Sequence, residues 1–499
     1  MENDRQKRPR RVAVIGGGIS GLAAAHRLIE LDPACDLALL EAAPRLGGVL
    51  STVHEEGFQV EQSADNFITT IPWGLDLCKR LGLSDQLIQT NPAHRQTYVV
   101  RRGRLHKLPD GFLMMAPTRM WPLAVTPILS PLGKLRAAME YFIPPRKDTA
   151  DESMASFVCR RLGRETFDRL VEPLVGAVYA ADMEKLSVEA TLSRFREMEC
   201  EHGSLIRAMR RQMKSRPKGK PESGARYSMF VTLRDGLSSL IEAIAGRLPQ
   251  GAARLNTTVE RIERHDDGWR LALKKGSGLF SAEEPARHER ASLEKESRPL
   301  LQEEELFDAV IIATPSHTAA RLLRPIDAEL AADLGQIEHS GTAIVSLGYE
   351  RRQIGHPLDG MGAVVPAIEQ SPILACSFSS QKYAHRAPEG KTLLRVFVGG
   401  ARRPELAEMD DQQLLPLVTG QLERLLQIEG DPIYCNIAHW PRTMPQYHVG
   451  HKELVARIEH RVEAIPSLRL CGNAFHGVGL PDCIHGGERA AERILPANA

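Results

Sequence analysis

The sequence predicts a mixed α/β (α+β) fold, and three observations support that class. Residues 11–31 have the pattern of a strand, a glycine-rich turn and a helix. Residues 154–213 carry helical periodicity, and strand-like apolar runs recur between residues 343 and 471. With 499 residues, the chain is long enough for about two or three domains.

The first element is a strand-turn-helix unit. Arg11 to Ile15 form an apolar strand-like run that enters the turn Gly16-Gly17-Gly18-Ile19-Ser20-Gly21 and then a helical pattern. A second strand-like run, Leu37 to Leu40, ends at Glu41, about 20 residues after the last glycine of the turn. This spacing is typical of one half of a Rossmann-like sheet.

The turn and Glu41 together predict a bound dinucleotide. Gly16, Gly18 and Gly21 let the backbone approach a pyrophosphate, and the following helix presents its positive end to that anion. Glu41 can accept hydrogen bonds from both ribose hydroxyls, and a carboxylate there repels a 2′-phosphate. We therefore expect FAD or NAD rather than NADP. The alternative is a tight turn beside a surface glutamate.

The middle of the chain predicts mainly helices. Residues 81–142 contain repeated prolines, which favour short helices joined by bends, and residues 154–213 follow a helical period. Residues 276–305 are rich in Ser, Glu and Arg and contain few large apolar side chains, so we expect a flexible insert there. Strand-like segments at residues 269–273 and 307–315 flank this insert.

The last third predicts further strands and a closing helix. Strand-like runs lie at residues 343–349 and 393–398, and a helical pattern follows at residues 414–426. Another strand at residues 468–471 precedes a glycine-rich passage from Gly472 to Gly487. A helix carrying Ala490, Ala491, Ile494 and Leu495 is expected after this passage.

Composition excludes several classes of protein. The 64 Lys and Arg against 63 Asp and Glu leave a net charge of +1, so no nucleic-acid partner is expected. The cysteines form no C-x-x-C pair and the histidines no H-E-x-x-H, so no metal site is expected. Residues 1–11 are charged and lack an apolar core, which predicts a cytoplasmic protein without a secretory signal.

A longer motif favours FAD over NAD. After Glu41 the chain continues Ala42-Ala43-Pro44-Arg45-Leu46-Gly47-Gly48, which resembles the Glu-x-x-x-Arg-x-Gly-Gly signature of FAD-containing oxidases of the amine oxidase superfamily. We expect Arg45 to lie near the phosphates, the alternative being a solvated surface charge. Gly47 and Gly48 remove Cβ atoms where the backbone passes close to the extended cofactor. The passage Gly472 to Cys483 precedes a helix whose amino terminus would face the flavin end.

Four separated stretches extend the resemblance. Residues 12–48, 172–187, 439–451 and 477–484 resemble the oxygen-dependent protoporphyrinogen oxidase family, the FAD-dependent porphyrinogen oxidases of the amine oxidase superfamily. The chain departs from the family pattern where Ser63-Ala64-Asp65-Asn66 replaces a Gly-Pro-x-Ser run, and at His485, where Ser is usual. These departures leave the cofactor contacts near the flavin open without affecting the fold.

The resemblance implies three domains. A discontinuous Rossmann-like FAD-binding domain comprises residues 8–80, 228–318 and 455–499, and a mixed-sheet substrate-binding domain comprises residues 81–97 and 319–454. Residues 98–227 form a helical domain that contacts a membrane, and residues 276–305 form the flexible insert.

The resemblance also implies site residues. The implied cofactor contacts are Gly16, Gly18, Ile19, Ser20, Gly21, Glu41, Ala42, Arg45, Gly47, Gly48, Val259, Gly472, Val478, Gly479 and Leu480. The implied substrate contacts are Arg95, Leu174, Met361, Gly362 and Val364. Arg95 would grip a propionate, while the other four would sandwich the macrocycle, the alternatives being a surface arginine and ordinary core packing. No catalytic side chain is implied, because the protein mainly holds a meso carbon against flavin N5.

The implied reaction is the six-electron oxidation of protoporphyrinogen IX to protoporphyrin IX, in which three O₂ become three H₂O₂. One alternative is coproporphyrinogen III oxidation to coproporphyrin III, for which His94, Arg101, Arg102 and Arg104 could serve the additional carboxylates. The cofactor motif also permits an amine oxidase or desaturase-like oxidase, or a porphyrin carrier without turnover. Oxygen uptake and the bound flavin's response to each substrate distinguish these activities.

Membrane contact is a further expectation. Residues 120–133 are uncharged and apolar, contain three prolines, and are flanked by Arg119 and Lys134. This segment is too short to span a bilayer but suits peripheral binding at the inner face of the membrane, the alternative being a buried lid over the substrate slot. Hand-off of the porphyrin to ferrochelatase is a further expected partnership, and the sequence predicts no particular oligomeric state.

Overall fold

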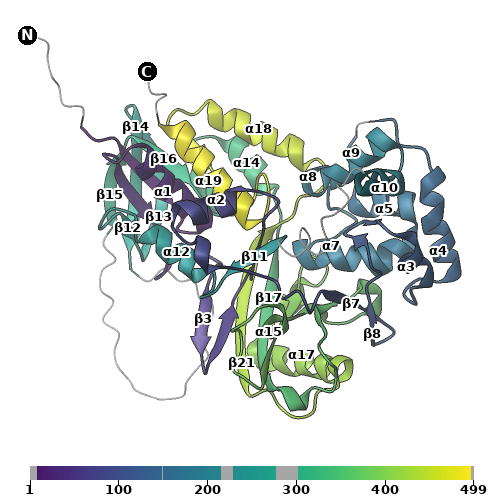
Figure 1. The fold of residues 1–499 in the computed structure, drawn as a ribbon. Coiled ribbons are helices and arrows are strands. Elements are labelled where there is room, and N and C mark those ends of the chain that lie inside the picture. Colours follow the sequence, from purple (N-terminus) through teal and green to yellow (C-terminus); the bar gives the residue numbers. More distant parts are fainter. Residues whose placement is uncertain (1–7, 149, 215–228, 277–301, 496–499) are drawn as a thin grey trace, which may run out of the picture.

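The computed structural model describes residues 8–148, 150–214, 229–276 and 302–495, and its fold is mixed α/β as the sequence predicts. Figure 1 shows a sheet with flanking helices at the upper left, a second sheet at the lower centre and a group of helices at the right. The division into three domains at the stated boundaries remains a prediction.

The first sheet is parallel and has five strands in the order β12-β2-β1-β16-β22. Its members are β1 Arg11–Ile15, β2 Asp36–Leu40, β12 Ala253–Arg254, β16 Ala309–Ile312 and β22 Leu468–Leu470. The central strands are buried on both faces, which explains their continuous apolar runs. The predicted opening βαβ unit is therefore confirmed by β1, β2 and the helix α1, Ile19–Leu31.

Helices cover one face of this sheet. Helices α1, α12 (Ser238–Ala245) and α19 (Leu480–Ile494) contribute to one apolar core, together with α2 (Trp73–Arg80). The predicted start of the last helix is wrong, because α19 already begins at Leu480 and includes Gly487. A Cβ on Gly487 would lie 2.1 Å from the Ser20 carbonyl oxygen, so this glycine lets α19 cross α1 closely.

A three-stranded antiparallel sheet covers the other face. It consists of β13 Thr257–His265, β14 Gly268–Lys275 and β15 Gln302–Phe307, and it shares a core with α13 Ser316–Leu323, α14 Ala328–Gly335 and α18 His451–Glu463. Residues 277–301 of the expected insert lie outside the described residues. The prediction is wrong for residues 302–305, which pair with β14 and whose acidic side chains reach neighbouring cations, including Arg254.

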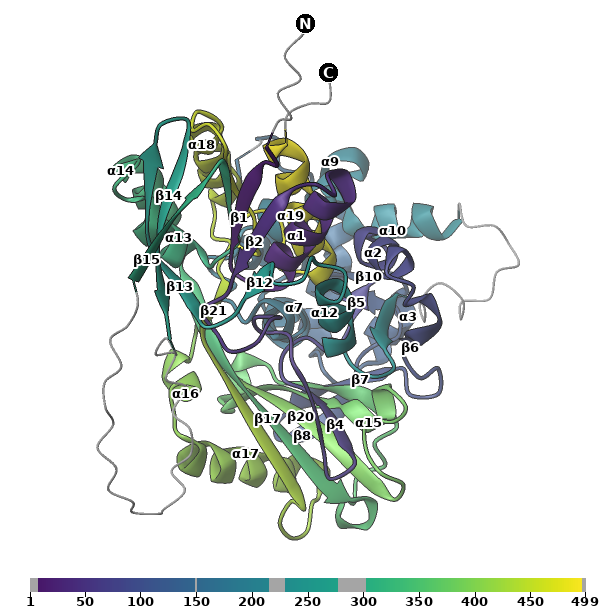
Figure 2. The ribbon, with the colours of Figure 1, turned by 90° about the vertical axis from the view of Figure 1, so that its left-hand side faces the viewer.

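The second large sheet has seven strands in the order β21-β17-β20-β19-β18-β7-β8. Its strands are β7 Gln96–Arg101, β8 Arg104–Lys107, β17 His339–Glu350, β18 Gly360–Val364, β19 Ile373–Phe378, β20 Lys391–Gly399 and β21 Tyr434–Pro445. Helix α17, Asp411–Leu426, packs on one face of it and is seen at the lower left in Figure 2. The strands and the helix predicted between residues 343 and 426 are therefore confirmed.

The prediction of only short helices between residues 81 and 142 is wrong. This part contains β6 Leu87–Gln89, β7, β8, β9 Phe112–Leu113 and β10 Ala116–Pro117 besides short helices. Strand β7 pairs in parallel with β18, far along the chain, so its partner is invisible to a local pattern. Both β7 and β8 lie in the seven-stranded sheet, which consequently extends past the expected boundary at residues 97–98.

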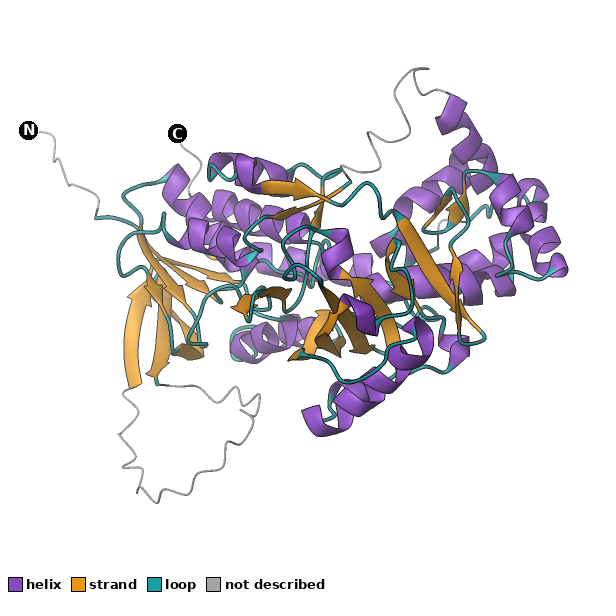
Figure 3. Cartoon of the chain, turned by 60° about the horizontal axis from the view of Figure 1, so that its bottom comes forward, coloured by secondary structure: helices purple, strands orange, loops and turns teal. Residues whose placement is uncertain are grey.

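The helices between residues 120 and 214 gather at one end of the molecule (Figure 3). They are α3 Met120–Val125, α4 Pro131–Ala138, the short η2 Met139–Phe142, α5 Met154–Leu162, α6 Arg164–Thr166, the π-helical η3 Phe167–Val171, α7 Glu172–Tyr179, α8 Val188–Thr191, α9 Ser193–His202 and α10 Leu205–Lys214. These helices enclose their own apolar core, hereafter the helical core, as the periodicity predicts. In the described part of the chain, every helix is too short or too polar to cross a bilayer.

Smaller strands connect these units. The hairpin β3 Thr52–Glu55 and β4 Phe58–Glu61 extends toward the second sheet, and β5 Phe67–Ile68 pairs with β11 Phe230–Leu233, which also pairs with β6. Short helices α15 Ser379–Lys382 and α16 Pro404–Ala407 follow strands of the second sheet. The residues between β4 and β5 contact the second sheet, since the Trp440 indole donates to the Gln62 carbonyl and Asp65 pairs with Arg395.

Candidate cofactor and substrate site

The glycine-rich turn after β1 is shaped by backbone contacts. Gly16 has a φ of 105°, a left-handed conformation that L residues rarely adopt. A Cβ on Gly21 would lie 1.9 Å from the Gly16 carbonyl oxygen, which no side chain could tolerate. Glycine at these two positions is therefore required by the backbone of the turn, independently of any ligand.

The first turn of α1 provides an anion site. Gly18 is the N-cap residue, in an extended conformation and without a side-chain cap. The amide groups of the first helical turn, which begins with Ile19 and Ser20, have no intrahelical acceptor and carry the positive end of the helix dipole. A Cβ on Gly18 would meet no atom within 4 Å, so the backbone here borders open space. This cradle fits a pyrophosphate.

Glu41 is held rigidly beside this turn. Its Oε2 accepts a hydrogen bond from the Gly17 amide at 2.6 Å, and its Oε1 accepts one from the Ala43 amide at 2.7 Å. Each carboxylate oxygen retains a second lone pair for a ribose hydroxyl. The Glu41 carbonyl accepts from Thr257 at 2.8 Å, which places the start of β13, two residues before Val259, next to Glu41 and Ala42.

Arg45 closes the loop that follows. Its guanidinium donates to the carbonyl oxygens of Leu46, Gly48 and Leu50, the shortest contact being 2.7 Å to Gly48. The Gly47 amide donates to the Gly17 carbonyl at 2.8 Å, and a Cβ on Gly48 would lie 3.1 Å from the Gly18 Cα. The Glu-x-x-x-Arg-x-Gly-Gly motif thus folds against the glycine-rich turn, as a cofactor-binding role requires.

A second helix start lies near the first. Gly479 caps α19 without a side-chain hydrogen bond, and Leu480 at the start of that helix shares a core with α1. Gly472 follows β22, the strand next to β16 in the same parallel sheet as β1. Val478 instead packs against the helical core. The structure therefore brings the two glycine-rich segments to the same edge of the sheet, a donor set that fits an extended dinucleotide.

The expected substrate residues come from three elements. Strand β18, with Met361, Gly362 and Val364, pairs with β7, so that Gly360 lies opposite Gln96, the residue after Arg95. Leu174 on α7 packs against the same helical core as Val364. Leu174 and Val364 therefore share this core with Val478, while Met361 and Gly362 lie on the same strand as Val364. Arg95 directly precedes β7, the neighbouring strand.

One face of the seven-stranded sheet carries two cross-strand rows that sequence reasoning missed. The apolar row comprises Val99, Val364, Ala375, Phe397, Ile344 and Ala438. The polar row beside it comprises Thr97, Gly362, Ser377, Arg395, Ser346 and Asn436. An apolar surface with one polar border suits a flat macrocycle that carries carboxylates. Arg395, inside the apolar run from Leu393 to Val398, was a signal of it in the sequence.

The segment that departs from the family pattern covers this polar row. Asp65 forms ion pairs with Lys382 at 3.0 Å and with Arg395 at 3.3 Å, and Arg395 also donates to the Ser63 carbonyl. Burial alone would raise the pKa of Asp65, but the charges of Lys382 and Arg395 hold it below its ordinary value. Asp65, at the variable position of that pattern, is therefore a largely buried carboxylate with two counter-ions.

The other cations considered for carboxylate binding lie elsewhere. Arg101 ends β7 and Arg104 begins β8, so about six residues of strand, or roughly 20 Å, separate them from Arg95. Arg102 lies in the turn between these two strands, whereas His94 directly precedes Arg95. Only His94 is thus placed near Arg95, while the three arginines lie at the opposite end of β7.

Fold and site together define a FAD-dependent oxidoreductase. The family described as flavin containing amine oxidoreductase matches residues 19–495. The coproporphyrinogen III oxidase of Bacillus subtilis (strain 168) is 33% identical, with 97% of both chains covered. That of Propionibacterium freudenreichii is 34% identical, with 97% of this chain and 91% of the relative covered. The chain belongs to the flavin-containing amine oxidoreductases and, within them, to the FAD-dependent porphyrinogen oxidases.

More distant relatives agree with this assignment. The chloroplastic protoporphyrinogen oxidase of Nicotiana tabacum is 28% identical over 96% of this chain and 84% of its own length. A crystal structure from Exiguobacterium sp. 255-15, provisionally named a protoporphyrinogen oxidase, matches with a TM-score of 0.82 and 30% identity, covering 97% of this chain and 98% of that one. A reduced UDP-galactopyranose mutase, at 17% identity and a TM-score of 0.69 over 97% of this chain and 95% of that one, shares the fold alone.

Proposed function

We propose that this protein oxidises coproporphyrinogen III to coproporphyrin III, with three O₂ reduced to three H₂O₂. The observation that supports this substrate is sequence identity. The chain is 31–34% identical to three bacterial coproporphyrinogen III oxidases and 26–28% identical to five plant protoporphyrinogen oxidases. The resemblance implied protoporphyrinogen IX first and coproporphyrinogen III as the alternative, and the identities favour the alternative.

The residues around the site have separable roles in this proposal. Bound FAD supplies the two-electron acceptor for each of the three oxidations. The glycine-rich turn and Glu41 hold its pyrophosphate and ribose, and the segment from Gly472 to Leu480 lies along its flavin end. Leu174, Met361 and Val364 hold the apolar macrocycle and exclude water, while Arg95 binds a propionate at the margin. No acid or base is required, because orientation against the flavin is the protein's main contribution.

Substrate preference tests the proposal directly. Purified protein should oxidise coproporphyrinogen III with a kcat/KM at least about tenfold higher than that for protoporphyrinogen IX, a difference of about 1.4 kcal/mol in transition-state binding. Porphyrin fluorescence and H₂O₂ release would be followed with each substrate under identical conditions. A higher kcat/KM for protoporphyrinogen IX would refute the substrate, and oxidation of an amine or a polyene alone would refute the porphyrinogen class.

We further propose that the helical end binds a membrane surface peripherally. Six large apolar side chains are exposed on α3, α4 and η2: Trp121, Val125, Leu132, Leu135, Met139 and Phe142, with exposed fractions of 51–79%. Nearby on α10, the guanidinium groups of Arg207 and Arg210 lie 4.4 and 5.8 Å from the centre of the Tyr141 ring. An exposed apolar face beside cations suits an anionic lipid surface better than a buried lid. Hand-off to ferrochelatase remains a prediction.

Vesicle flotation tests the membrane proposal. The protein should float with vesicles that contain anionic lipid, and should float several-fold less with purely zwitterionic vesicles or at high salt. Replacing Leu132 and Phe142 by Ser should reduce flotation strongly, because both are nearly 80% exposed and contribute little to the core. A matched control is Leu306→Ser, whose side chain is 49% exposed on a distant strand. Equal recovery of all variants in the unbound fraction would reject the proposal.

A further inference from the structure

Tyr447 contacts the segment between Gly472 and Gly479, which is expected to lie at the flavin end of the cofactor and is called the flavin-end segment. It follows β21, is 2% exposed, and donates a hydrogen bond from its hydroxyl to the Asn473 carbonyl. The same hydroxyl accepts a hydrogen bond from the Gly477 amide at 2.9 Å. One phenolic oxygen therefore fixes two points of the segment between Gly472 and Gly479, whose residues Gly472, Val478 and Gly479 are expected to contact FAD.

His451 supports both Tyr447 and this segment. The two rings stack with their centroids 4.0 Å apart and an interplanar angle of 13°. His451 is 4% exposed, and its Nε2 lies 3.3 Å from the Phe475 carbonyl oxygen. Because burial lowers the pKa of His451 to about 4, the ring is neutral near pH 7, and Nε2 carries the proton that the carbonyl accepts.

The same short stretch is anchored to the helical end of the molecule. The Tyr447 carbonyl accepts from the Ser187 amide at 2.8 Å, and the Val449 amide donates to the Lys185 carbonyl at 2.9 Å. The Gly450 amide donates to Asp151 Oδ2 at 3.1 Å. Residues 447–451 thus connect the segment near the flavin to the residues between α7 and α8, which pack in the same helical core as Leu174.

We propose that Tyr447 and His451 are positioning residues that set the segment from Asn473 to Val478 against the flavin ring and couple its position to the helical end. Val478, at one end of this segment, packs in the helical core with Leu174 and Val364. A shift of the segment would therefore change the surroundings of the flavin and the apolar substrate slot together. The part of the inference that concerns the substrate slot rests on the proposed function. The part that concerns the flavin rests only on FAD binding.

Tyr447→Phe tests the inference because it removes the hydroxyl and keeps the stacked ring. We expect the FAD dissociation constant to rise about tenfold, since two hydrogen bonds to the segment are lost. We also expect a shifted absorption maximum and midpoint potential of the bound flavin, and a fall in kcat larger than any change in KM. His451→Gln, which keeps an N–H donor but loses the stack, should show a smaller change in the same direction.

The matched control is Tyr349→Phe, which removes the hydroxyl of another buried tyrosine, on the face of β17 that packs against α17. It should leave the flavin spectrum and FAD affinity unchanged. Wild-type FAD affinity, spectrum and potential in Tyr447→Phe would overturn the inference, as would a lowered melting temperature with an unaltered flavin. FAD affinity, flavin spectrum and midpoint potential are measured without a porphyrinogen. An error in the proposed substrate would therefore be recognised separately, from the activity of the wild-type protein.

Discussion

Gly18→Ala is expected to give a folded protein that purifies without its yellow cofactor. The φ of −70° and ψ of 175° at Gly18 are accessible to alanine, and the added Cβ would meet no protein atom within 4 Å. The open space that it would enter borders the first turn of α1, where the pyrophosphate is expected to lie. We therefore expect FAD affinity to fall at least about 100-fold, or about 2.7 kcal/mol, while the melting temperature of the apoprotein changes little.

Two other glycines serve as controls for this experiment. Gly420→Ala, in the interior of α17, adds a Cβ that meets nothing within 4 Å and should leave both FAD binding and stability at least at wild-type levels. Gly21→Ala places its Cβ 1.9 Å from the Gly16 carbonyl and should destabilise the fold by about 3 kcal/mol. Calorimetric titration with FAD and thermal melting measure both effects. Unchanged FAD affinity in Gly18→Ala would remove the turn from the cofactor site.

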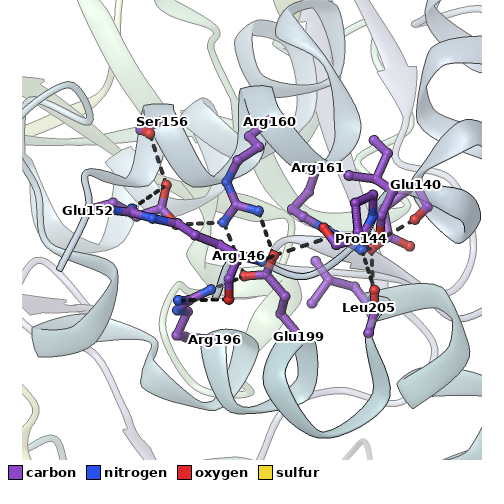
Figure 4. Close-up of polar contacts among 12 residues, drawn as sticks. Glu140, Pro144, Arg146, Glu152, Ser156, Arg160, Arg161, Arg196, Glu199 and Leu205 are labelled. Atoms are coloured by element: carbon purple, nitrogen blue, oxygen red, sulfur yellow. Dashed lines mark hydrogen bonds and ion pairs between the residues drawn. The ribbon is translucent and has the colours of Figure 1, made fainter. Parts of the chain in front are cut away.

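Arg161→Met is expected to destabilise the helical end severely. Arg161 and Glu140 are both fully buried, and the guanidinium donates to Glu140 Oε1 from Nε at 2.9 Å (Figure 4). Glu140 also accepts from the amides of Leu205 and Ile206 at 2.8 and 3.2 Å, and so caps the start of α10. Removing the arginine leaves a buried carboxylate without its counter-ion, at a cost of about 3–5 kcal/mol.

Hydrogen exchange measures this loss of stability in the helices concerned. Amides of α5 and α10 should exchange about 100- to 4,000-fold faster in Arg161→Met, since each 1.4 kcal/mol changes a local opening equilibrium about tenfold. The control is Arg164→Met, three residues away, whose side chain is 64% exposed and pairs with Asp168 and Glu184. That change should cost at most about 1 kcal/mol. Similar exchange in the two variants would show that the buried pair does not hold these helices together.

The buried pair also bears on the proposed membrane surface. Glu140 lies in η2 between the exposed Met139 and Phe142, and Arg161 donates to the carbonyls of Ile143 and Pro144 as well. The ion pair therefore fixes the segment that presents apolar side chains to solvent. Weakening it should disturb membrane binding as a consequence of lost local structure, which is why the flotation test uses surface substitutions instead.

The site shows where sequence reasoning succeeds and where it stops. The turn from Gly16 to Gly21 and the acceptor Glu41 were predictable, because each contact in this unit joins residues that are close in the chain or related by a known spacing. The polar row through Arg395 was not, because it exists only when β18, β19, β20, β17 and β21 lie side by side in one register. Strand β7 was missed for the same reason, since it pairs with β18.

By itself, the sequence determined the opening βαβ unit, the choice of FAD and the porphyrinogen oxidase family, because short-range glycine, acid and arginine spacings carry that information. Only the tertiary structure decided which distant residues meet. It placed Asp65 between Lys382 and Arg395, stacked Tyr447 on His451 behind the flavin-end segment, and buried Arg161 against Glu140. Such contacts depend on long-range packing, in which the burial of apolar surface brings together polar groups that no local pattern relates.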